Sequence, residues 1–336
     1  MGFKRFCWIF AAVLLLSGCG RAQTSAEETV PQATAPDLAG QEIYVDTVEL
    51  EIHDPAQEMV VVIDAKEAAL ADILEPEASG ELVMETDKVI IDYSNTADGY
   101  VMVQFKAQTQ RRLKVQVKSS TTYTYNLPQG QWAVFPFTDG NGPYQVKVFE
   151  NVSGSQYSLV AALEQDIALT DEFAPFLRPN QYVDYSSASK AVEKAWDLTW
   201  DIDNPLGKVE AVYNFVVSEL RYDNERAATV KSGYVPVLDN VLEEKKGICF
   251  DYAALMTGML RSQGIPCKMV FGYTGGAYHA WISVWTEDTG WVDGVIFFDG
   301  VAWQRLDPTF ASYDGQSDRI MRYIGDGTNY REKYFY

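Results

Sequence analysis

A cysteine in the C-terminal half of the sequence has the surroundings of a catalytic nucleophile. Cys249 lies two residues after Gly247 and precedes a run of strong helix formers, residues 253–260. Gly264-Ile265-Pro266 then ends the predicted helix. This spacing predicts that Cys249 lies at or near the start of a helix. Unpaired backbone N–H groups at a helix start favour the thiolate, which is the nucleophilic form of cysteine.

A thiol nucleophile needs a base, and the sequence contains two histidines, His53 and His279. Only His279 lies in the same half as Cys249, within an alternating segment, 278–285, that predicts a strand. Asp307 belongs to a second predicted strand that begins at Trp303 and is ended by the following proline. His53 stands alone, and we expect it to be a solvated or hydrogen-bonded structural residue.

The region from 185 to 310 resembles the transglutaminase-like superfamily. The resemblance is carried by motifs in a fixed order: Gly247-Ile248-Cys249-Phe250-Asp251-Tyr252-Ala253, Gly264-Ile265-Pro266, His279-Ala280-Trp281 and Leu306-Asp307-Pro308-Thr309. It implies a papain-like fold with a Cys-His-Asp triad. In that triad Cys249 is the nucleophile, His279 is the general base and Asp307 is the acid that orients the imidazole.

An acyl-transfer site also needs donors for the oxyanion, and the backbone N–H of Cys249 is one candidate. The glutamine that papain-like enzymes carry six residues upstream is replaced here by Glu243. Tyr222 or Tyr234 could serve as the second donor. Four aromatic residues are candidates for lining the substrate cleft: Tyr222, Tyr234, Tyr252 and Trp281.

The N-terminus has the layout of an export signal. Lys4 and Arg5 precede an apolar run, residues 6–16, that is too short to span a bilayer. The run ends in Leu16-Ser17-Gly18-Cys19, which resembles a bacterial lipobox, so we expect Cys19 to carry a lipid on an extracytoplasmic lipoprotein. The alternative is an ordinary secretory signal with an incidental cysteine. Residues 20–40 have little to bury and predict a flexible tether.

The excess of acidic residues argues against a nucleic-acid partner. The chain has 47 acidic and 27 basic residues and a formal net charge of −20, so we expect no nucleic-acid partner. We expect a monomer that meets peptide or protein substrates at the cell surface and touches the membrane through its lipid alone. The sequence has no calcium-loop pattern and no zinc-type cluster, so we expect neither a metal nor another cofactor.

The two cysteines of the C-terminal half, Cys249 and Cys267, could pair in an oxidising compartment. However, Cys267 lies in an apolar strand-like segment, 266–271, where cysteine behaves as a small buried hydrophobe. We therefore expect Cys267 to have a packing role and Cys249 to remain a free thiol.

The predicted fold is α+β in two domains. Seven short segments read as strands separated by turn signals, which predicts an antiparallel β-sandwich domain over residues 41–175: 89–93, 100–106, 113–118, 121–127, 132–137, 144–150 and 157–163. A helical stretch, 65–74, precedes them. Residues 176–336 are expected to form the transglutaminase-like catalytic domain, and residues 1–19 the signal peptide.

Within the predicted catalytic domain, residues 186–196 and 205–220 are expected to be helices, and residues 222–244 a loop beside the cleft. His279 and Asp307 can meet only if their two strands pair directly. Residues 287–298 must therefore lie outside the core pairing. The aromatic C-terminal segment, 317–336, is expected to dock on the core.

Three functions remain open at this stage. A thiol hydrolase would cut peptide or amide bonds of cell-envelope or extracellular proteins, and exposure to water favours it. A transferase would pass the same acyl group from a glutamine carboxamide to an amine. A binding module would retain the triad without using it.

Overall fold

The computed structural model describes residues 65–274, 277–287, 290–293, 297–298, 303–304 and 330–336. All of them belong to one compact unit, Asp54–Tyr336. The predicted signal peptide and tether, Cys19, His53 and Asp307 lie outside the described residues. The predicted domain boundaries remain predictions. Among the described helices, none is long and apolar enough to cross a membrane.

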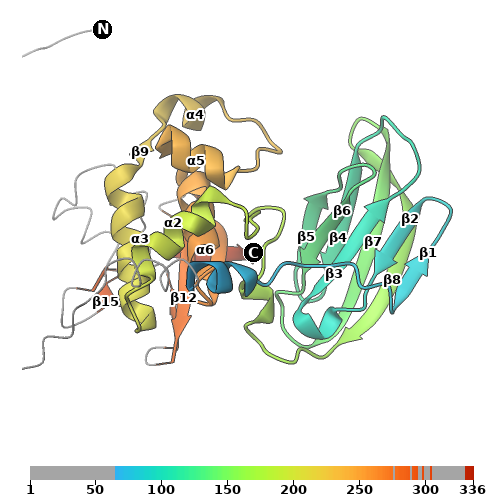
Figure 1. Cartoon of the computed structure of the whole chain (residues 1–336). Coiled ribbons are helices and arrows are strands. Elements are labelled where there is room, and N and C mark those ends of the chain that lie inside the picture. Colours follow the sequence, from blue (N-terminus) through green and yellow to red (C-terminus); the bar gives the residue numbers. More distant parts are fainter. Residues whose placement is uncertain (1–64, 275–276, 288–289, 294–296, 299–302, 305–329) are drawn as a thin grey trace, which may run out of the picture. The chain divides into compact units, whose positions relative to one another are not determined.

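The N-terminal part of the unit is built from two four-stranded antiparallel sheets (Figure 1). The first has the order β1 (Val83–Glu85), β2 (Val89–Asp92), β3 (Tyr100–Phe105) and β6 (Trp132–Pro136). The second has the order β5 (Thr122–Asn126), β4 (Leu113–Lys118), β7 (Gly142–Ser153) and β8 (Gln156–Ile167). All seven predicted strands are therefore confirmed, and β1 was missed.

Alternation explains why these segments form strands. Along β4, Leu113, Val115 and Val117 are buried while the residues between them are partly exposed, as expected for a strand with one face on the core. Buried residues of both sheets belong to one apolar cluster. The stretch predicted as a helix over 65–74 is helical over 65–71.

Five helices follow: α2 (Lys190–Thr199), α3 (Pro205–Glu219), α4 (Asn224–Thr229), α5 (Leu238–Glu244) and α6 (Cys249–Arg261). The side chain of Asn204 caps α3 by accepting from the N–H of Gly207 at 2.6 Å, with Pro205 in the first turn. An apolar stripe at helical spacing faces the core, and its residues are at most 3% exposed: Val209, Val212, Tyr213, Val216 and Leu220.

The prediction of a loop over residues 222–244 is wrong, because this segment contains α4 and α5. Asp223 caps α4 by accepting from the N–H of Arg226 at 2.9 Å. On α5, Leu238 and Val241 are buried. A residue of α5 also caps the start of α2. The carboxylate of Asp239 accepts from the backbone N–H groups of Lys190 and Ala191 in the first turn of α2.

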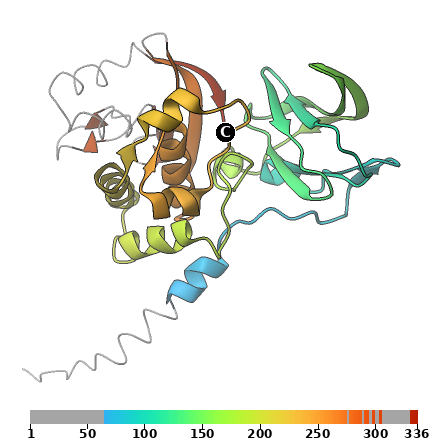
Figure 2. The same cartoon turned by 90° about the horizontal axis from the view of Figure 1, so that it is seen from above.

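A third four-stranded sheet has the order β13 (Gly290–Asp293), β12 (Ala277–Thr286), β11 (Cys267–Thr274) and β16 (Tyr330–Phe335), and every pairing is antiparallel. Helix α6 packs against β11 and β12. Figure 2 shows the C-terminal strand beside this sheet, so docking of the end of the aromatic segment is confirmed.

The prediction that residues 287–298 lie outside the core pairing holds in one part and is wrong in the other. β14 (Phe297–Phe298) pairs with β15 (Trp303–Gln304) in a separate two-stranded sheet. Residues 290–293, however, join the core sheet as β13. Gly290, at φ 67°, suits the turn that brings them back, and Trp285 lies directly opposite Trp291 across the strands.

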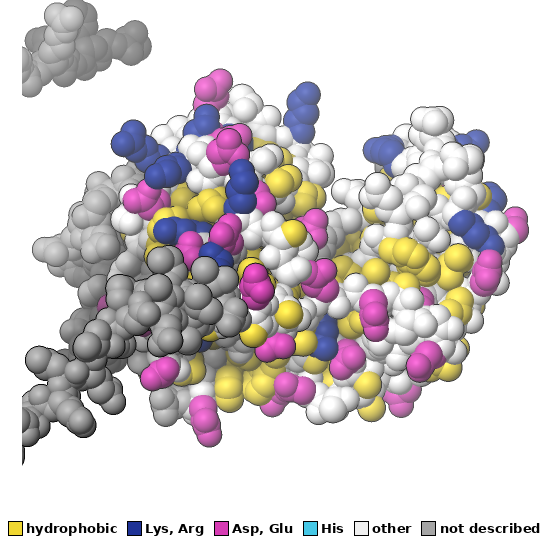
Figure 3. Space-filling model, viewed as in Figure 1, with side chains coloured by type: hydrophobic (Ala, Val, Ile, Leu, Met, Phe, Trp, Pro, Cys, Tyr) yellow, Lys and Arg dark blue, Asp and Glu magenta, His cyan; other side chains and the backbone are white. Residues whose placement is uncertain are grey.

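On the face drawn in Figure 3, most Lys and Arg side chains lie in the upper part and acidic side chains predominate in the lower part. Many acidic groups of the described part are paired. Lys66, for example, donates to both Glu193 and Asp197 at 2.9 and 3.0 Å.

Candidate active site

Helix α6 begins at Cys249, as the sequence predicts. The preceding residue, Ile248, has an extended backbone, and its N–H donates to the carboxylate of Asp251 at 2.8 Å. The carboxylate thus satisfies an N–H just before the helix and lies in its first turn, where negative charge complements the dipole. The side chain of Cys249 is left partly exposed at the helix start.

His279 and Cys249 line the same pocket, whose volume is about 460 Å³. His279 is the third residue of β12, opposite Gly272 of β11, and is 9% exposed. Its ring lies near that of Trp281, with centroids 6.4 Å apart and planes at 26°. Two residues from separate elements, one at a helix start and one on a strand, therefore face one cavity.

Gly272 allows this strand arrangement. A Cβ atom at Gly272 would lie 2.5 Å from the ring of Trp281 and 2.2 Å from the carbonyl oxygen of Arg331. Because neither separation is compatible with a side chain, only glycine lets β16 and Trp281 approach β11 here. The position opposite His279 is thus fixed by close packing.

The cleft candidates fall into two groups. Tyr222 and Tyr234 line the pocket with Cys249. Tyr252 and Trp281 are 0% and 1% exposed and are not among its lining residues, so both are core residues in this structure.

Tyr234 belongs to a hydrogen-bond network that joins the pocket wall to helix α6. Its hydroxyl donates to Asp251 at 2.5 Å, and Arg226 donates to the same hydroxyl at 3.3 Å and to the same carboxylate at 3.4 Å. Arg226 also donates to Glu244 at 2.7 Å. Burial and the bond to Asp251 both raise the pKa of Tyr234, so the phenol stays protonated.

This network argues against Tyr234 as the predicted second oxyanion donor. The hydroxyl hydrogen of Tyr234 is engaged by a carboxylate, and a proton held in this way is not available to a developing oxyanion. Tyr222, the other predicted donor, also lines the pocket. It belongs to β9 (Arg221–Tyr222), which pairs with β10 (Lys246–Gly247), so Tyr222 lies beside Gly247, two residues before Cys249.

Asp251 was quoted in the sequence motif but given no role, and the structure shows that it is fully buried. A Cβ atom at Gly247 would lie 2.4 Å from that of Asp251. The glycine therefore makes room for the carboxylate that receives Ile248, Tyr234 and Arg226. An acidic residue in the first helical turn, four residues after a glycine, was the available signal.

Sequence reasoning also missed most of the aromatic lining of the pocket. Tyr182, Phe250, Phe271, Tyr278 and Tyr336 all line it, and they come from the segment before α2, from α6, β11 and β12, and from the residue after β16. Such a set has no local signature in the sequence.

A buried arginine holds part of that lining in place. The guanidinium of Arg261, at the end of α6, donates to the main-chain oxygens of Cys267 at 2.9 Å, Arg178 at 2.7 Å and Tyr336 at 2.6 Å. Burial lowers the pKa of Arg261. One side chain thus joins the end of α6, the segment before α2, the start of β11 and the residue that closes the pocket.

Cys267 is fully buried and not disulfide-bonded, as predicted. Burial raises the pKa of its thiol to about 12, and its Sγ lies 3.6 Å from the hydroxyl of Thr257. Its packing role is therefore confirmed.

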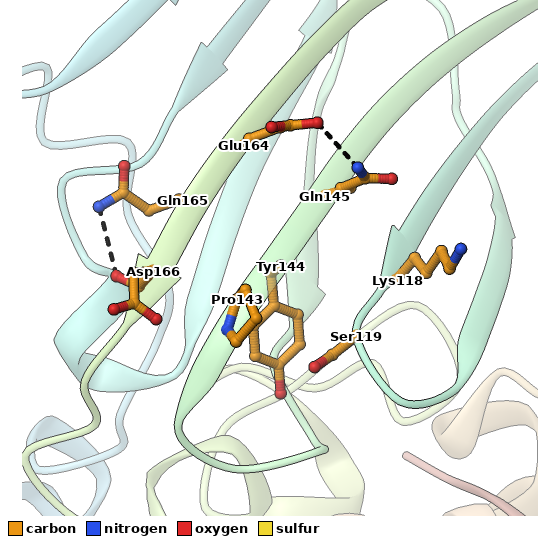
Figure 4. A pocket seen from close by; sticks show the side chains of 8 residues that line it. All are labelled: Lys118, Ser119, Pro143, Tyr144, Gln145, Glu164, Gln165 and Asp166. Atoms are coloured by element: carbon orange, nitrogen blue, oxygen red, sulfur yellow. Dashed lines mark hydrogen bonds between the residues drawn. The ribbon is translucent and has the colours of Figure 1, made fainter.

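A second hollow lies on the β4–β7–β8 sheet and has a volume of about 430 Å³ (Figure 4). Gln145 donates to Glu164 at 2.8 Å there, and Gln165 donates to the main-chain oxygen of Asp166 at 3.4 Å. None of its 8 lining residues is a cysteine or a histidine. In the part of the chain that the structure describes, no group of three or more His, Cys, Asp or Glu side chains could hold a metal ion.

Comparison with known proteins finds a family match for part of the C-terminal region. Residues 193–294 match the core of the transglutaminase-like superfamily. The chain carries a transglutaminase-like core domain. The match spans α6 and β12, and with them Cys249 and His279.

Three curated relatives are similar over limited stretches. The chain is 32% identical over 114 residues to an uncharacterized protein, YebA, of Bacillus subtilis, covering 28% of this chain and 16% of that protein. It is 30% identical over 139 residues to an uncharacterized protein, ML0607, of Mycobacterium leprae, covering 38% and 46%. It is 32% identical over 68 residues to a protein-glutamine gamma-glutamyltransferase of Pseudomonas aeruginosa, covering 16% and 10%. The chain thus spans less than half the length of each.

Solved structures are similar at low identity. A candidate cysteine protease from Cytophaga hutchinsonii is 13% identical, with a TM-score of 0.35 and coverage of 76% of this chain and 73% of that one. Red sea bream transglutaminase is 12% identical, with a TM-score of 0.28 and coverage of 67% and 53%.

Proposed function

We propose that this protein is an exported, lipid-anchored thiol enzyme that hydrolyses amide or peptide bonds of cell-envelope or extracellular proteins. The observation that carries the proposal is the shared pocket of Cys249, at the start of α6, and His279, on β12. A sulfur nucleophile and an imidazole base facing one cavity, in a transglutaminase-like core, are the parts that an acyl-enzyme mechanism needs.

The mechanism follows from the roles of these groups. His279 accepts the thiol proton as the sulfur of Cys249 attacks the carbonyl carbon of the amide. The imidazolium then donates this proton to the leaving amine as the C–N bond breaks, which leaves a thioester on Cys249. Water, deprotonated by His279, attacks the thioester and releases the carboxylic acid and the free thiol.

The proposal assigns Asp307 to the far side of the imidazole, where its carboxylate would fix the ring tautomer. The assignment rests on the resemblance of Leu306-Asp307-Pro308-Thr309 to the family motif. The described start of the strand predicted to carry Asp307, β15, pairs with β14 and not with β12, so the assignment requires the chain to approach His279 after Gln304. The N–H of Cys249 and the hydroxyl of Tyr222 are assigned to the oxyanion.

Hydrolysis is tested by release of new amino termini from casein, with incorporation of a fluorescent amine followed in parallel. We expect amino termini to appear with the wild-type protein and not with the Cys249→Ala variant. Incorporation of the amine without new termini would instead support protein-glutamine acyl transfer. This second candidate is favoured by the similarity to the Pseudomonas aeruginosa gamma-glutamyltransferase.

The third possibility, a binding module that does not use its triad, makes a different prediction. Iodoacetamide would then modify Cys249 in the folded protein no faster than it modifies a free cysteine peptide, and neither assay would give product. A thiol that reacts faster than the free peptide supports the enzyme.

The lipid anchor is a separate part of the proposal, supported by the lipobox-like Leu16-Ser17-Gly18-Cys19. Radiolabelled palmitate should enter the wild-type protein and not the Cys19→Ala variant. Equal labelling of the two, or no labelling of either, would remove the lipid from the account and leave an ordinary secretory signal.

A further inference from the structure

The pocket beside Cys249 is distinguished by the aromatic rings in its wall. Phe250 directly follows Cys249 in α6, and Tyr278 directly precedes His279 in β12. Both side chains line the pocket together with Phe271 of β11. An aromatic surface thus adjoins both groups of the proposed acyl transfer.

These rings pack on one another in defined geometries. The rings of Phe250 and Phe271 meet edge to face, with centroids 4.8 Å apart and planes at 77°. Phe271 and Tyr278 lie nearly parallel, 5.8 Å apart and at 15°. Tyr182 closes the cluster at 5.8 Å from Phe250. Contacts of this kind are the preferred arrangements of aromatic groups, and another ring can extend them.

The cluster is both held in place and open to a ligand. Tyr336 contacts the rings of Tyr182 and Phe271 at 4.6 and 5.6 Å. Its main chain is fixed by bonds to Arg261 and to the N–H of Met269. Tyr278, by contrast, is 52% exposed, so a bound group can still bury apolar surface there.

The other residues that line the pocket restrict which chemical groups it can bind. Among the lining residues that the structure describes there is no Asp, Glu, Asn or Gln, and Lys231 is the one side chain of fixed charge. A cationic side chain buried there would find hydroxyl groups but no carboxylate among these residues. Lys231 also opposes a cation. The volume of about 460 Å³ lies within the roughly 300–1,000 Å³ of small-ligand sites.

We propose that this pocket receives a large apolar side chain of the substrate, an aromatic one by preference, next to the amide that Cys249 attacks. This inference rests on the proposed function, because it places the side chain relative to the scissile bond. It adds the substrate class, namely peptide segments with a bulky apolar residue beside the reacting amide.

The test uses N-acetyl amino acid chloromethyl ketones in which the amino acid is Phe, Ala, Lys or Glu. The sulfur of Cys249 displaces chloride and forms a thioether, so peptide mapping by mass spectrometry gives a rate without any turnover. Each rate is divided by that of iodoacetamide with the same variant. We expect the Phe probe to react at least about tenfold faster than the Ala probe, and the Lys and Glu probes to react no faster than Ala.

A matched pair of variants locates the preference. Tyr278→Ala removes a half-exposed ring from the pocket, and we expect the Phe-to-Ala ratio to fall about threefold or more, since aromatic pairs contribute on this scale. Trp200→Ala removes a ring that is 53% exposed outside the pocket and should leave the ratio unchanged. Equal rates for Phe and Ala, or a faster Lys probe, would overturn the inference.

Binding to the Cys249→Ala variant separates this inference from the proposed function. Calorimetry with N-acetyl-phenylalanine amide should show tighter binding than N-acetyl-alanine amide, whether or not the thiol is reactive. Selective binding with an inert thiol would keep the pocket assignment and reject the enzyme. A reactive thiol without selectivity would keep the enzyme and reject the aromatic preference.

Discussion

The start of α6 and the start of β11 each carry a cysteine, but the two side chains differ in their exposure and in their neighbours. Cys249 is partly exposed, lies at a helix start and shares a pocket with His279. Cys267 is fully buried, and burial raises the pKa of its thiol to about 12. The same side chain is thus a candidate nucleophile in one place and a packing residue in the other. Exposure and local backbone decide which.

The pocket at Cys249 and the hollow of Figure 4 also differ in the chemical groups that line them. The pocket at Cys249 and the groove of Figure 4 have similar volumes, about 460 and 430 Å³. The first holds a thiol, an imidazole and a cluster of rings. The second holds amides and carboxylates that bond to one another or to the main chain of the same sheet. Chemical groups, and not size, make the first the candidate site.

Substitution of the two cysteines should give the largest difference. We expect Cys249→Ala to lower kcat/KM for amide hydrolysis by at least about 10³-fold, because it removes the nucleophile. Cys267→Ala should leave kcat/KM within about twofold, since Cys267 does not reach the pocket. Steady-state hydrolysis of a fluorogenic peptide checks both. Similar losses in the two variants would break the comparison.

The opposite end of α6 should show a large effect on stability. Arg261→Met removes three hydrogen bonds to main-chain oxygens, two of them buried, while the oxygen of Tyr336 keeps its bond from the N–H of Met269. We expect the free energy of unfolding to fall by about 3 kcal/mol. Chemical denaturation followed by tryptophan fluorescence measures this change.

Lys190→Met serves as the control for the same kind of substitution. Lys190 is largely exposed and pairs with Glu243 at 3.6 Å, so we expect a loss of less than about 1 kcal/mol. An Arg261 variant as stable as this control would show that the three bonds do not hold the segments together.

The pH dependence of stability should distinguish Cys267 from alanine. Its folded pKa is raised, so the buried thiol stabilises the fold fully below the unfolded value, near 9, and this contribution is lost as the pH rises toward 12. Between pH 8 and 10 the wild-type protein should lose about 1.5 kcal/mol more stability than Cys267→Ala. Urea denaturation at the two pH values measures it, and parallel losses would contradict the assignment.

The smallest effect is expected at the groove of Figure 4. Glu164→Ala removes the acceptor of Gln145 on the sheet surface, and we expect hydrolysis of casein to change by less than about twofold. Quantifying new amino termini checks this. A loss of tenfold or more would show that the sandwich takes part in substrate capture and that the two hollows are not as different as their chemistry indicates.

Local patterns predicted much of the fold. The alternation of β4, the Asn204-Pro205 start of α3 and the helix start at Cys249 each depend on neighbours in sequence, and each appears as expected. The prediction of a loop over residues 222–244 failed because the helices found there depend on tertiary contacts. Helix α5 is short and is held by two buried side chains, Leu238 and Val241.

The residues of the candidate site also fall into those that local motifs indicated and those that they did not. Motifs indicated Cys249 and His279, and the structure lines one pocket with both. Two partners of Asp251, Arg226 and Tyr234, and two carbonyls bound by Arg261 come from segments farther along the chain, so no local spacing could reveal them. Asp307 stays a prediction, because it lies outside the described residues.

Trapping the acyl-enzyme tests the central claim most directly. A p-nitrophenyl ester of N-acetyl-phenylalanine, mixed with the Cys267→Ala protein and quenched in acid, should leave an acetyl-phenylalanyl group on Cys249 that peptide mapping by mass spectrometry locates. The His279→Asn variant should form this thioester at least about 10²-fold more slowly, because it lacks the general base. An adduct that forms equally fast in both proteins, or none at Cys249 in either, would contradict the account.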